Sequence, residues 1–436
     1  MNPTTNNTTN DDAPASGRSS PWSVFLAFLR LGLTSFGGPI AHLGYFRSEF
    51  VERRKWLDDR SYSDLVALCQ FLPGPASSQV GIAIGMQRAG WLGSIAAWTG
   101  FTLPSALALI AFAYAIASHR AWAESGAVHG LKVVAVAVVA QAVWGMARSL
   151  CPDRPRAGLA VFAALLTLAL PGAVGQVGAI VVAGVVGRGQ LELPQQAAMP
   201  HRSFGVSRRA GGAALAVFGL LLLGLPIAAG VSGSPLLSLI AGFFRAGALV
   251  FGGGHVVLPL LQATVVPSGA VSNADFLAGY GAAQAVPGPL FTFAAYLGAV
   301  MHGALSGWGG GLAFLVAIFV PAYLLVVGAL PFWDALRQRG DVQSAMAGIN
   351  AGVVGILLAA LYDPVWTGAI RSRADFGLAL AAFGLLVHAR ASPLVVVALA
   401  AAGGGSWDCC DAGCAGSAGP AGGQCRLFAT TATRHG

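Results

Sequence analysis

The sequence predicts an all-α polytopic membrane protein made of two inverted-topology repeats, with broken or re-entrant helices and a transmembrane helix that connects the repeats. Three observations lead to this prediction. Of the 436 residues, 56% are hydrophobic and only 10% are charged, whereas a soluble domain carries roughly 25% charged residues. One unusual motif occurs twice, half a chain apart. The loops that follow its two copies differ in charge.

Five apolar runs are long enough to cross a bilayer as helices. They lie at residues 91–117, 131–147, 210–230, 307–330 and 344–362. Residues 1–21 are polar and of low complexity, without the basic start and apolar core of a signal peptide. We therefore expect a disordered N-terminal tail followed by a helical membrane domain.

The repeated motif joins an arginine to a glycine-rich break. Residues 28–42 read FLRLGLTSFGGPIAH, and residues 243–255 read FFRAGALVFGGGH. Two later motifs also return: QFLPGP at 70–75 as QAVPGP at 284–289, and FTLP at 101–104 as IFVP at 318–321. The offset stays between 214 and 217 residues. Each half is therefore predicted to contain the same series of elements.

The expected series is an FGG-broken segment, a PGP-broken segment, a long helix with an internal proline, another helix and a short apolar pair. The pairs lie at 157–187, predicted as a hairpin, and at 375–402. The run at 210–230 has no counterpart and must connect the halves. The predicted parts are a tail at 1–21, a first repeat at 22–187, a basic loop and connector helix at 188–234, a second repeat at 235–402 and a Gly/Cys-rich tail at 403–436. The cysteines of that last tail lack zinc-finger spacing, so disorder is expected there and no metal site.

The loops after the two FGG segments predict that the repeats are inverted. The first loop contains five basic residues, Arg47, Arg53, Arg54, Lys55 and Arg60, and its counterpart at 262–274 contains none. Because positively charged loops face the cytoplasm, equivalent loops of opposite bias are expected on opposite sides of the membrane. The same rule explains the formal charge of +8, so the expected partner is the lipid bilayer and not nucleic acid. Trp56 in the basic loop is interpreted as an interfacial anchor.

Glycine and proline inside membrane segments leave backbone groups unpaired. The bilayer tolerates this only where the backbone is buried in protein or lines a polar cavity. Broken helices at corresponding positions of two inverted halves indicate a transporter's substrate site. Half-helices that begin after such breaks direct free N–H groups and a positive dipole end inward, which favours an anion. The four breaks are Gly37-Gly38-Pro39, Pro73-Gly74-Pro75, Gly252-Gly253-Gly254 and Pro287-Gly288-Pro289.

Two arginines strengthen the prediction of an anion. Arg30 and Arg245 each precede the FGG break by six residues, within apolar sequence. A guanidinium group can bind two oxygens of an oxyanion and stays charged at physiological pH. The alternative is that both side chains snorkel to a membrane interface.

Two pairs of polar residues near the breaks keep two interpretations each. Gln70 and Gln284 precede the PGP motifs, where an amide can bind substrate or bridge helices. His42 and His255 follow the FGG breaks, where an imidazole can respond to protons or be a satisfied buried side chain.

No acidic residue lies deep in an apolar segment, which disfavours a cation site or a carboxylate proton relay. Asp64 and Asp275 are expected to cap helices at the entrances of the PGP elements. The chain has no HExxH motif, no GxSxG motif with triad partners and no P-loop lysine. It is therefore predicted not to be an enzyme, with no catalytic residue, metal or cofactor. Any uphill transport must then use an ion or proton gradient.

The motifs FGGPIAH, the basic stretch ending in WLDD, PGP, FGGGHVVLPLL and QAVPGP resemble those of the chromate transporter family over about residues 22–402. The resemblance implies the long two-domain form, a multi-pass carrier of the bacterial inner membrane that exports chromate by the proton-motive force and gives chromate resistance. Chromate is a tetrahedral dianion like sulfate, so the alternative is a carrier or channel for sulfate or another tetrahedral oxyanion. A homodimer is a further expectation.

By motif position, the resemblance implies substrate-binding roles in both repeats. In the first repeat these residues are Arg30, Gly37, Gly38, Pro39, His42, Gln70, Pro73, Gly74 and Pro75. In the second they are Arg245, Gly252, Gly253, His255, Gln284, Pro287, Gly288 and Pro289.

Overall fold

The computed structural model describes residues 19–36, 38–118, 126–170, 172–191, 205–251, 254–303, 305–333, 335, 339–389, 391–392 and 395–400. Over these residues the regular secondary structure is all helix, with no strand. The predicted tail at 403–436 and residues 1–18 of the predicted N-terminal tail lie outside the described residues.

The order of helices repeats, as predicted. The first repeat contains α1 (Pro21–Thr34), α2 (Gly38–Arg47), η1 (Ser48–Arg53), α3 (Asp59–Phe71), α4 (Ala76–Ser118), α6 (Gly126–Leu150), α7 (Arg154–Ala169) and α8 (Ala173–Gln190). The connector is α9 (Arg208–Ser232). The second repeat contains α10 (Pro235–Ala248), η2 (Gly254–Val256), α11 (Val257–Val265), α12 (Asn273–Ala285), η3 (Leu290–Thr292), α13 (Phe293–Val300), α14 (Gly307–Ala329), η4 (Leu330–Phe332), α16 (Gly340–Ala360), η5 (Leu361–Trp366), α17 (Thr367–Ala369) and α18 (Arg373–Val387).

Five helical segments among the described residues are long and apolar enough to cross a membrane. They lie at 76–118, 129–150, 208–232, 307–332 and 340–369, and each contains one of the five predicted runs. In the first repeat, α4 continues through a kink at Ala89 and Gly90. In the second repeat the same stretch is divided into α13 and α14. The predicted all-α polytopic fold with two repeats is confirmed.

Helix caps extend the repeat beyond the motifs. Ser20 caps α1 and Ser234 caps α10, and a proline follows each cap at the first helical position. Asp58 caps α3, and Ser272 caps α12. Both pairs are 214 residues apart. A side-chain oxygen at this position accepts a hydrogen bond from a free N–H of the first turn, so corresponding helices begin at corresponding residues.

The capping role expected for Asp64 is wrong. Its carboxylate accepts a hydrogen bond from the indole Nε1 of Trp333 at 3.1 Å and so links the two repeats. Asp275 contributes to a cap without being the capping residue, because its carboxylate accepts from the Ser272 hydroxyl at 2.6 Å.

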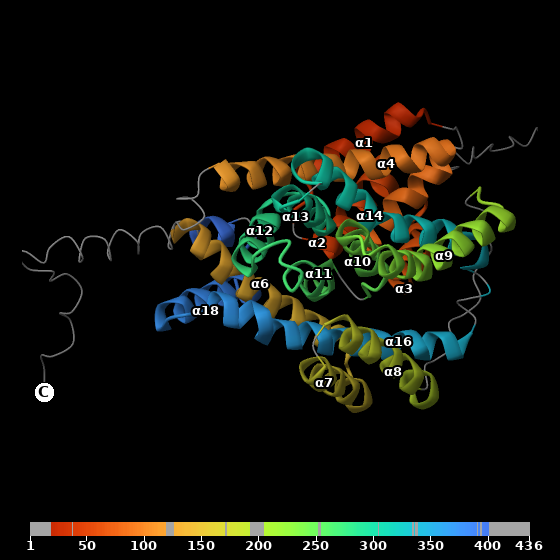
Figure 1. The fold of residues 1–436 in the computed structure, drawn as a ribbon. Helices are drawn as coiled ribbons and strands as arrows, with labels where there is room; N and C mark the ends of the chain where they lie inside the picture. The colour runs from red at the N-terminus through yellow and green to blue at the C-terminus, as the bar shows by residue number, and fades with distance from the viewer. Residues whose placement is uncertain are drawn as a thin grey trace, which may run out of the picture.

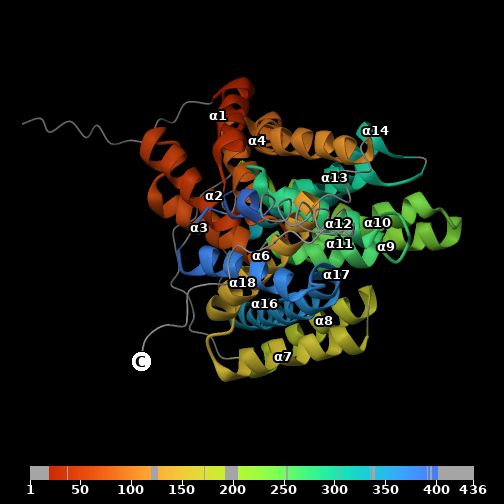
Figure 2. The same ribbon diagram turned by 90° about the vertical axis from the view of Figure 1, so that its left-hand side faces the viewer.

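The helices are arranged in successive layers. In Figures 1 and 2, α1 and α4 lie together on one side, α10 to α14 lie in the middle, and α6, α16 and α18 form a layer beyond them, with α7 and α8 outermost. The predicted 157–187 hairpin is the pair α7 and α8. Hairpins are exchanged between repeats, since α7 and α8 pack on α16 of the second repeat and α18 packs on α6 of the first.

The connector α9 lies at the edge of the molecule, where it contacts α10 and α14. Only 11% of its most apolar stretch is buried, and Leu220, Leu223, Ile227 and Val231 are exposed. Exposed leucine and isoleucine over the length of a spanning helix are what a lipid-facing surface requires. The segment without a counterpart is therefore peripheral to the repeats.

The interfacial-anchor interpretation of Trp56 is wrong. The ring is only 8% exposed and stacks on Phe50 at 5.0 Å between centroids. The guanidinium groups of Arg54 and Arg88 lie over it at 5.2 and 5.1 Å, as in cation–π contacts. Burial opposes ionisation of the neighbouring Glu49, but hydrogen bonds and charge from Arg54 and Arg53 outweigh it, so the pKa of the Glu49 carboxyl is lowered. Much of this basic loop is thus a folded, internally paired structure.

Inversion of the repeats predicts opposite labelling of two loops. Arg60 and Ser268 are exposed at equivalent parts of the two halves. A single cysteine at either position, in a chain whose native cysteines are replaced, shows on which side of the membrane that position lies. A membrane-impermeant maleimide should label Arg60→Cys only in inside-out vesicles and Ser268→Cys only in intact cells. Arg60 is a better probe than Arg54, whose guanidinium pairs with the buried Glu49. Labelling of both cysteines from one side would refute inversion.

Candidate functional site

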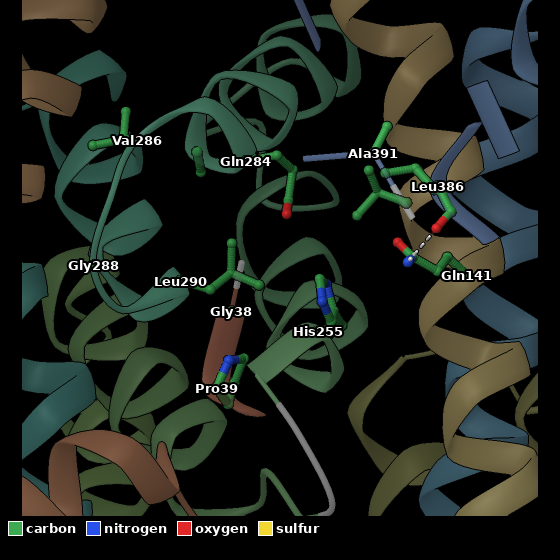
Figure 3. A pocket seen from close by; sticks show the side chains of 12 residues that line it. Gly38, Pro39, Gln141, His255, Gln284, Val286, Gly288, Leu290, Leu386 and Ala391 are labelled. Atoms are coloured by element: carbon green, nitrogen blue, oxygen red, sulfur yellow. Dashed lines mark hydrogen bonds between the residues drawn. The ribbon is translucent and has the colours of Figure 1, made fainter. Parts of the chain in front are cut away.

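A cavity of about 280 Å³ lies between the layer of broken elements and the layer of α6 and α18. It is large enough for several water molecules, or for a small anion with part of its hydration. The lining comes from both repeats: Gly38, Pro39, Val138, Gln141, His255, Ala283, Gln284, Val286, Gly288, Leu290, Leu386 and Ala391. Figure 3 shows these residues around one shared space. The cavity thus lies where a glycine break of each repeat meets the second PGP motif.

The breaks hold one another in place by two reciprocal hydrogen bonds. The Gly74 N–H donates to the Val250 carbonyl at 2.6 Å, and the Gly288 N–H donates to the Ser35 carbonyl at 2.9 Å. Each PGP motif therefore bonds to the residue just before the FGG break of the other repeat. Backbone groups freed by the breaks are satisfied across the interface between repeats, as a membrane interior requires. Such an exchange of equivalent contacts is the pattern of a two-fold relationship.

The central glycines of both PGP motifs adopt backbone conformations that side chains disfavour. The φ angles are +122° at Gly74 and +100° at Gly288. A Cβ atom at Gly74 would lie 3.0 Å from the Ala322 side chain, and one at Gly288 would lie 2.7 Å from the Ser105 hydroxyl. Ser105 and Ala322 are themselves equivalent residues of α4 and α14. Glycine is therefore required at both positions for close approach of the opposite repeat.

Polar groups at the cavity come mainly from the second repeat. His255 follows the second FGG break, and its Nδ1 lies 2.8 Å from the Tyr280 hydroxyl. Gln284 ends α12, and its buried amide nitrogen has no hydrogen-bond partner among the described residues. In Figure 3 these two side chains extend into the same space. An imidazole and an unpaired amide donor can both hydrogen-bond to an oxyanion.

The first repeat contributes the beginning of a helix to the cavity. Gly38 and Pro39 line it and are the first two residues of α2. The φ of Gly38 is +78°, which turns the chain sharply into the helix. The N-terminal end of α2, with its partial positive charge, is therefore at the cavity wall. This is the half-helix arrangement that the glycine breaks predicted.

Five of the predicted site residues line the cavity, namely Gly38, Pro39, His255, Gln284 and Gly288. Gly37, Gly252 and Gly253 lie outside the described residues. Gly74 and the prolines of the two PGP motifs, Pro73, Pro75, Pro287 and Pro289, do not line the cavity themselves. The remaining four, Arg30, His42, Gln70 and Arg245, are not part of the lining.

The two arginines occupy different environments. Arg30 is exposed on α1, and Arg245 is half-buried on α10. Neither guanidinium has an ion-pair or hydrogen-bond partner within the described part of the chain. Gln70 is exposed at the end of α3, unlike its counterpart Gln284. His42 is 1% exposed, with its Nδ1 3.4 Å from the Ser77 hydroxyl. Direct substrate contact by the arginines stays a prediction.

The cavity wall formed by α6 and the end of α18 was missed in the sequence analysis. Gln141 of α6 donates to the Leu386 carbonyl at 3.5 Å, across the repeat boundary, as the dashed line in Figure 3 shows. A signal was present, because Gln141 is a polar residue in the middle of the apolar run 131–147. The residues from α18 carry no such signal, since they reach the cavity through the exchange of hairpins.

Two repeats of broken helices around a cavity, with five membrane-length helices among the described residues, define a multi-pass membrane protein of the transporter class. The sequence model of the chromate transporter family matches residues 22–188 and 237–405. The chain therefore belongs to the chromate transporter family, and the two matched segments coincide with the two structural repeats.

Similar proteins extend over most of the chain. A chromate transport protein of Pseudomonas aeruginosa is 29% identical over 402 residues, covering 88% of this chain and 91% of its own length. Another, from Cupriavidus metallidurans, is 27% identical over 349 residues, covering 78% and 81%. A probable chromate transport protein of Synechococcus elongatus is 27% identical over 338 residues, covering 77% and 82%. No solved structure matches significantly.

Proposed function

We propose that this protein is a secondary active carrier that exports chromate across the bacterial inner membrane and thereby gives chromate resistance. The observation that carries the proposal is the cavity lined by the glycine break of the first repeat, by His255 after the break of the second, and by the second PGP motif. Its lining offers an imidazole and an amide as hydrogen-bonding groups, and the N-terminal end of α2 adds a partial positive charge. This combination favours a small anion and offers no carboxylate to a cation.

The proposed mechanism is alternating access, with one layer of the protein moving against the other. The cavity is bounded by the broken elements on one side and by α6 and α18 on the other. Relative movement of these layers would open the cavity first to one side of the membrane and then to the other. The proton-motive force is the proposed driving force. Arg30 and Arg245 are proposed to attract the anion toward this site. The anion is proposed to come closer to the half-buried Arg245 than to Arg30.

Transport of labelled chromate into inside-out vesicles tests the proposal, because an exporter fills such vesicles. Respiring vesicles that contain the protein should accumulate chromate several-fold above vesicles without it. A protonophore should abolish the accumulation, since the gradient would no longer drive uphill transport. Cells that express the gene should also tolerate more chromate and contain less of it.

Other outcomes of the vesicle experiment would indicate a different driving force, mechanism or substrate. Uphill accumulation that persists after the gradient is collapsed would contradict proton coupling. Flux that only ever runs downhill would indicate a channel. Sulfate transport without chromate transport would replace the substrate with another tetrahedral oxyanion.

A further inference from the structure

A cluster of buried polar side chains lies in the first repeat, next to the cavity. It consists of Ser35, His42, Ser77, Ser78, Thr102 and Ser105, here called the polar cluster. Each of these residues is at most 3% exposed. They come from the end of α1, from α2, from the first turn of α4 and from the proline-containing part of α4. Six buried polar residues gathered in one place within a membrane domain require a physical reason.

Contacts join the polar cluster to the cavity wall. The His42 imidazole lies beside the Ser35 backbone and 3.4 Å from the Ser77 hydroxyl. Gly288, which lines the cavity, donates its N–H to the Ser35 carbonyl. Its α-carbon also faces the Ser105 hydroxyl closely enough to exclude a side chain. Gly288 is therefore the thin partition between the cavity and the polar cluster.

Much of the polar cluster is not satisfied within the protein. Four buried atoms have no hydrogen-bond partner among the described residues: Ser35 Oγ, His42 Nε2, Ser78 Oγ and Thr102 Oγ1. An unpaired polar group in an apolar interior is destabilising. A set of four beside a cavity is what a site built for a hydrogen-bonding ligand contains before the ligand binds.

The second repeat shows that packing does not require these polar groups. The positions equivalent to Ser35, His42, Ser77, Thr102 and Ser105 are occupied by Val250, Val257, Phe291, Phe319 and Ala322. These five residues are also buried, and each is at most 2% exposed. The same places in the same fold are thus filled by apolar side chains. At these five positions the polar character belongs to the first repeat alone.

One pair keeps a hydroxyl in both repeats and provides an internal comparison. Ser78 and Thr292 are equivalent, 214 residues apart, and both are buried. The Thr292 hydroxyl donates to the Pro289 carbonyl at 2.8 Å, whereas the Ser78 hydroxyl has no partner among the described residues. Only the first-repeat hydroxyl is free to bind something else.

We propose that the polar cluster is the half-site that holds a tetrahedral oxyanion, and that the mostly apolar equivalent positions of the second repeat form no second such half-site. Hydroxyl groups, an imidazole N–H and the positive end of α4 at Ser77 and Ser78 are donors suited to oxyanion oxygens. The anion enters the cavity and reaches the donors when Gly288 withdraws from Ser35. This assignment rests on the proposed transport of an oxyanion, and it makes the two repeats unequal in binding.

Replacement of single hydroxyls tests the proposal, with the full-length protein in lipid nanodiscs and with chromate and sulfate as probes. Ser77→Ala and Ser78→Ala are each expected to weaken chromate binding about tenfold, because a hydrogen bond to a charged ligand is lost. Thr292→Val, the matched control in the second repeat, should change the affinity less than twofold. Thermal unfolding gives a second readout. Ser78→Ala should not lower the Tm of the ligand-free protein, since its hydroxyl is unpaired, but it should reduce the rise in Tm on adding chromate.

The outcomes separate this assignment from the proposed function. Wild-type transport of chromate with unchanged affinity in both serine variants would overturn the polar cluster as the binding site and leave the function intact. No chromate transport by the wild type, with sulfate binding weakened by the serine variants and not by Thr292→Val, would overturn the proposed substrate and support the site. Equal losses in Ser78→Ala and Thr292→Val would overturn the inequality of the repeats.

Discussion

Gly288→Ala is expected to abolish chromate transport and to destabilise the protein by about 2–5 kcal/mol. A left-handed backbone costs an alanine roughly 1–2 kcal/mol, and overpacking adds about 1–3 kcal/mol. The new methyl group would lie 2.7 Å from the Ser105 hydroxyl and 3.3 Å from the Phe101 carbonyl oxygen. It would push the second PGP motif away from α4 and break the hydrogen bond from the Gly288 N–H to the Ser35 carbonyl. Vesicle uptake measures the loss of transport, and thermal unfolding measures the loss of stability.

Two further glycines make this experiment specific. Gly74→Ala should have a similar effect, because its Cβ atom would meet the Ala322 side chain in the equivalent contact. Gly269→Ala is the matched control, since its φ is +72° and nothing lies within 4 Å of its Cβ position. It carries the backbone strain without the contact and should transport chromate normally. Full transport by Gly74→Ala and Gly288→Ala would show that close approach of the repeats is not needed.

Arg245→Ala is expected to abolish export while the protein still inserts in the membrane. The guanidinium is half-buried on α10, just before the second break, where an uncompensated positive charge attracts an anion. Arg245→Lys should retain part of the activity, because an ammonium keeps the charge but loses the planar fork. Chromate uptake by inside-out vesicles with equal amounts of protein measures both effects.

Replacement of Arg30 helps to distinguish arginines that bind the anion from arginines that lie at a membrane interface. It is exposed on α1, so its replacement by alanine is expected to have the smaller effect. Arg373→Ala, an exposed arginine at the beginning of α18, should leave export unchanged. If Arg30→Ala and Arg245→Ala both kept full chromate resistance, the arginines would be interfacial and the anion would depend on backbone dipoles and neutral donors.

The sequence was sufficient for the elements and their order. Apolar runs predicted the five long helices, because length and hydropathy are local properties. The FGG and PGP motifs located the breaks, because glycine and proline interrupt such helices. Those motifs also contain Gly38 and Gly288, which line the cavity. The family resemblance drawn from the motifs is also confirmed.

Tertiary contacts account for what the sequence did not predict. Gln141 and Leu386 reach the cavity through an exchange between repeats that no local pattern records. Trp56 was misinterpreted because a tryptophan in a basic loop can face lipid or, as here, stack on a buried phenylalanine and contact two guanidinium groups. The unpaired hydroxyl of Ser78 was also invisible, since a serine in a helix usually bonds to its own backbone, as Thr292 does in the other repeat.

The exchange of hairpins has a consequence for biosynthesis. α7 and α8 leave the ribosome long before α16, the helix on which they pack, and α6 must wait for α18. Domains generally fold in order of synthesis, but here the first repeat cannot be completed until almost the whole chain has been made. Membrane insertion and final folding are therefore separate events for this protein, and a fragment that ends after the first repeat would hold a pair of helices without their partner.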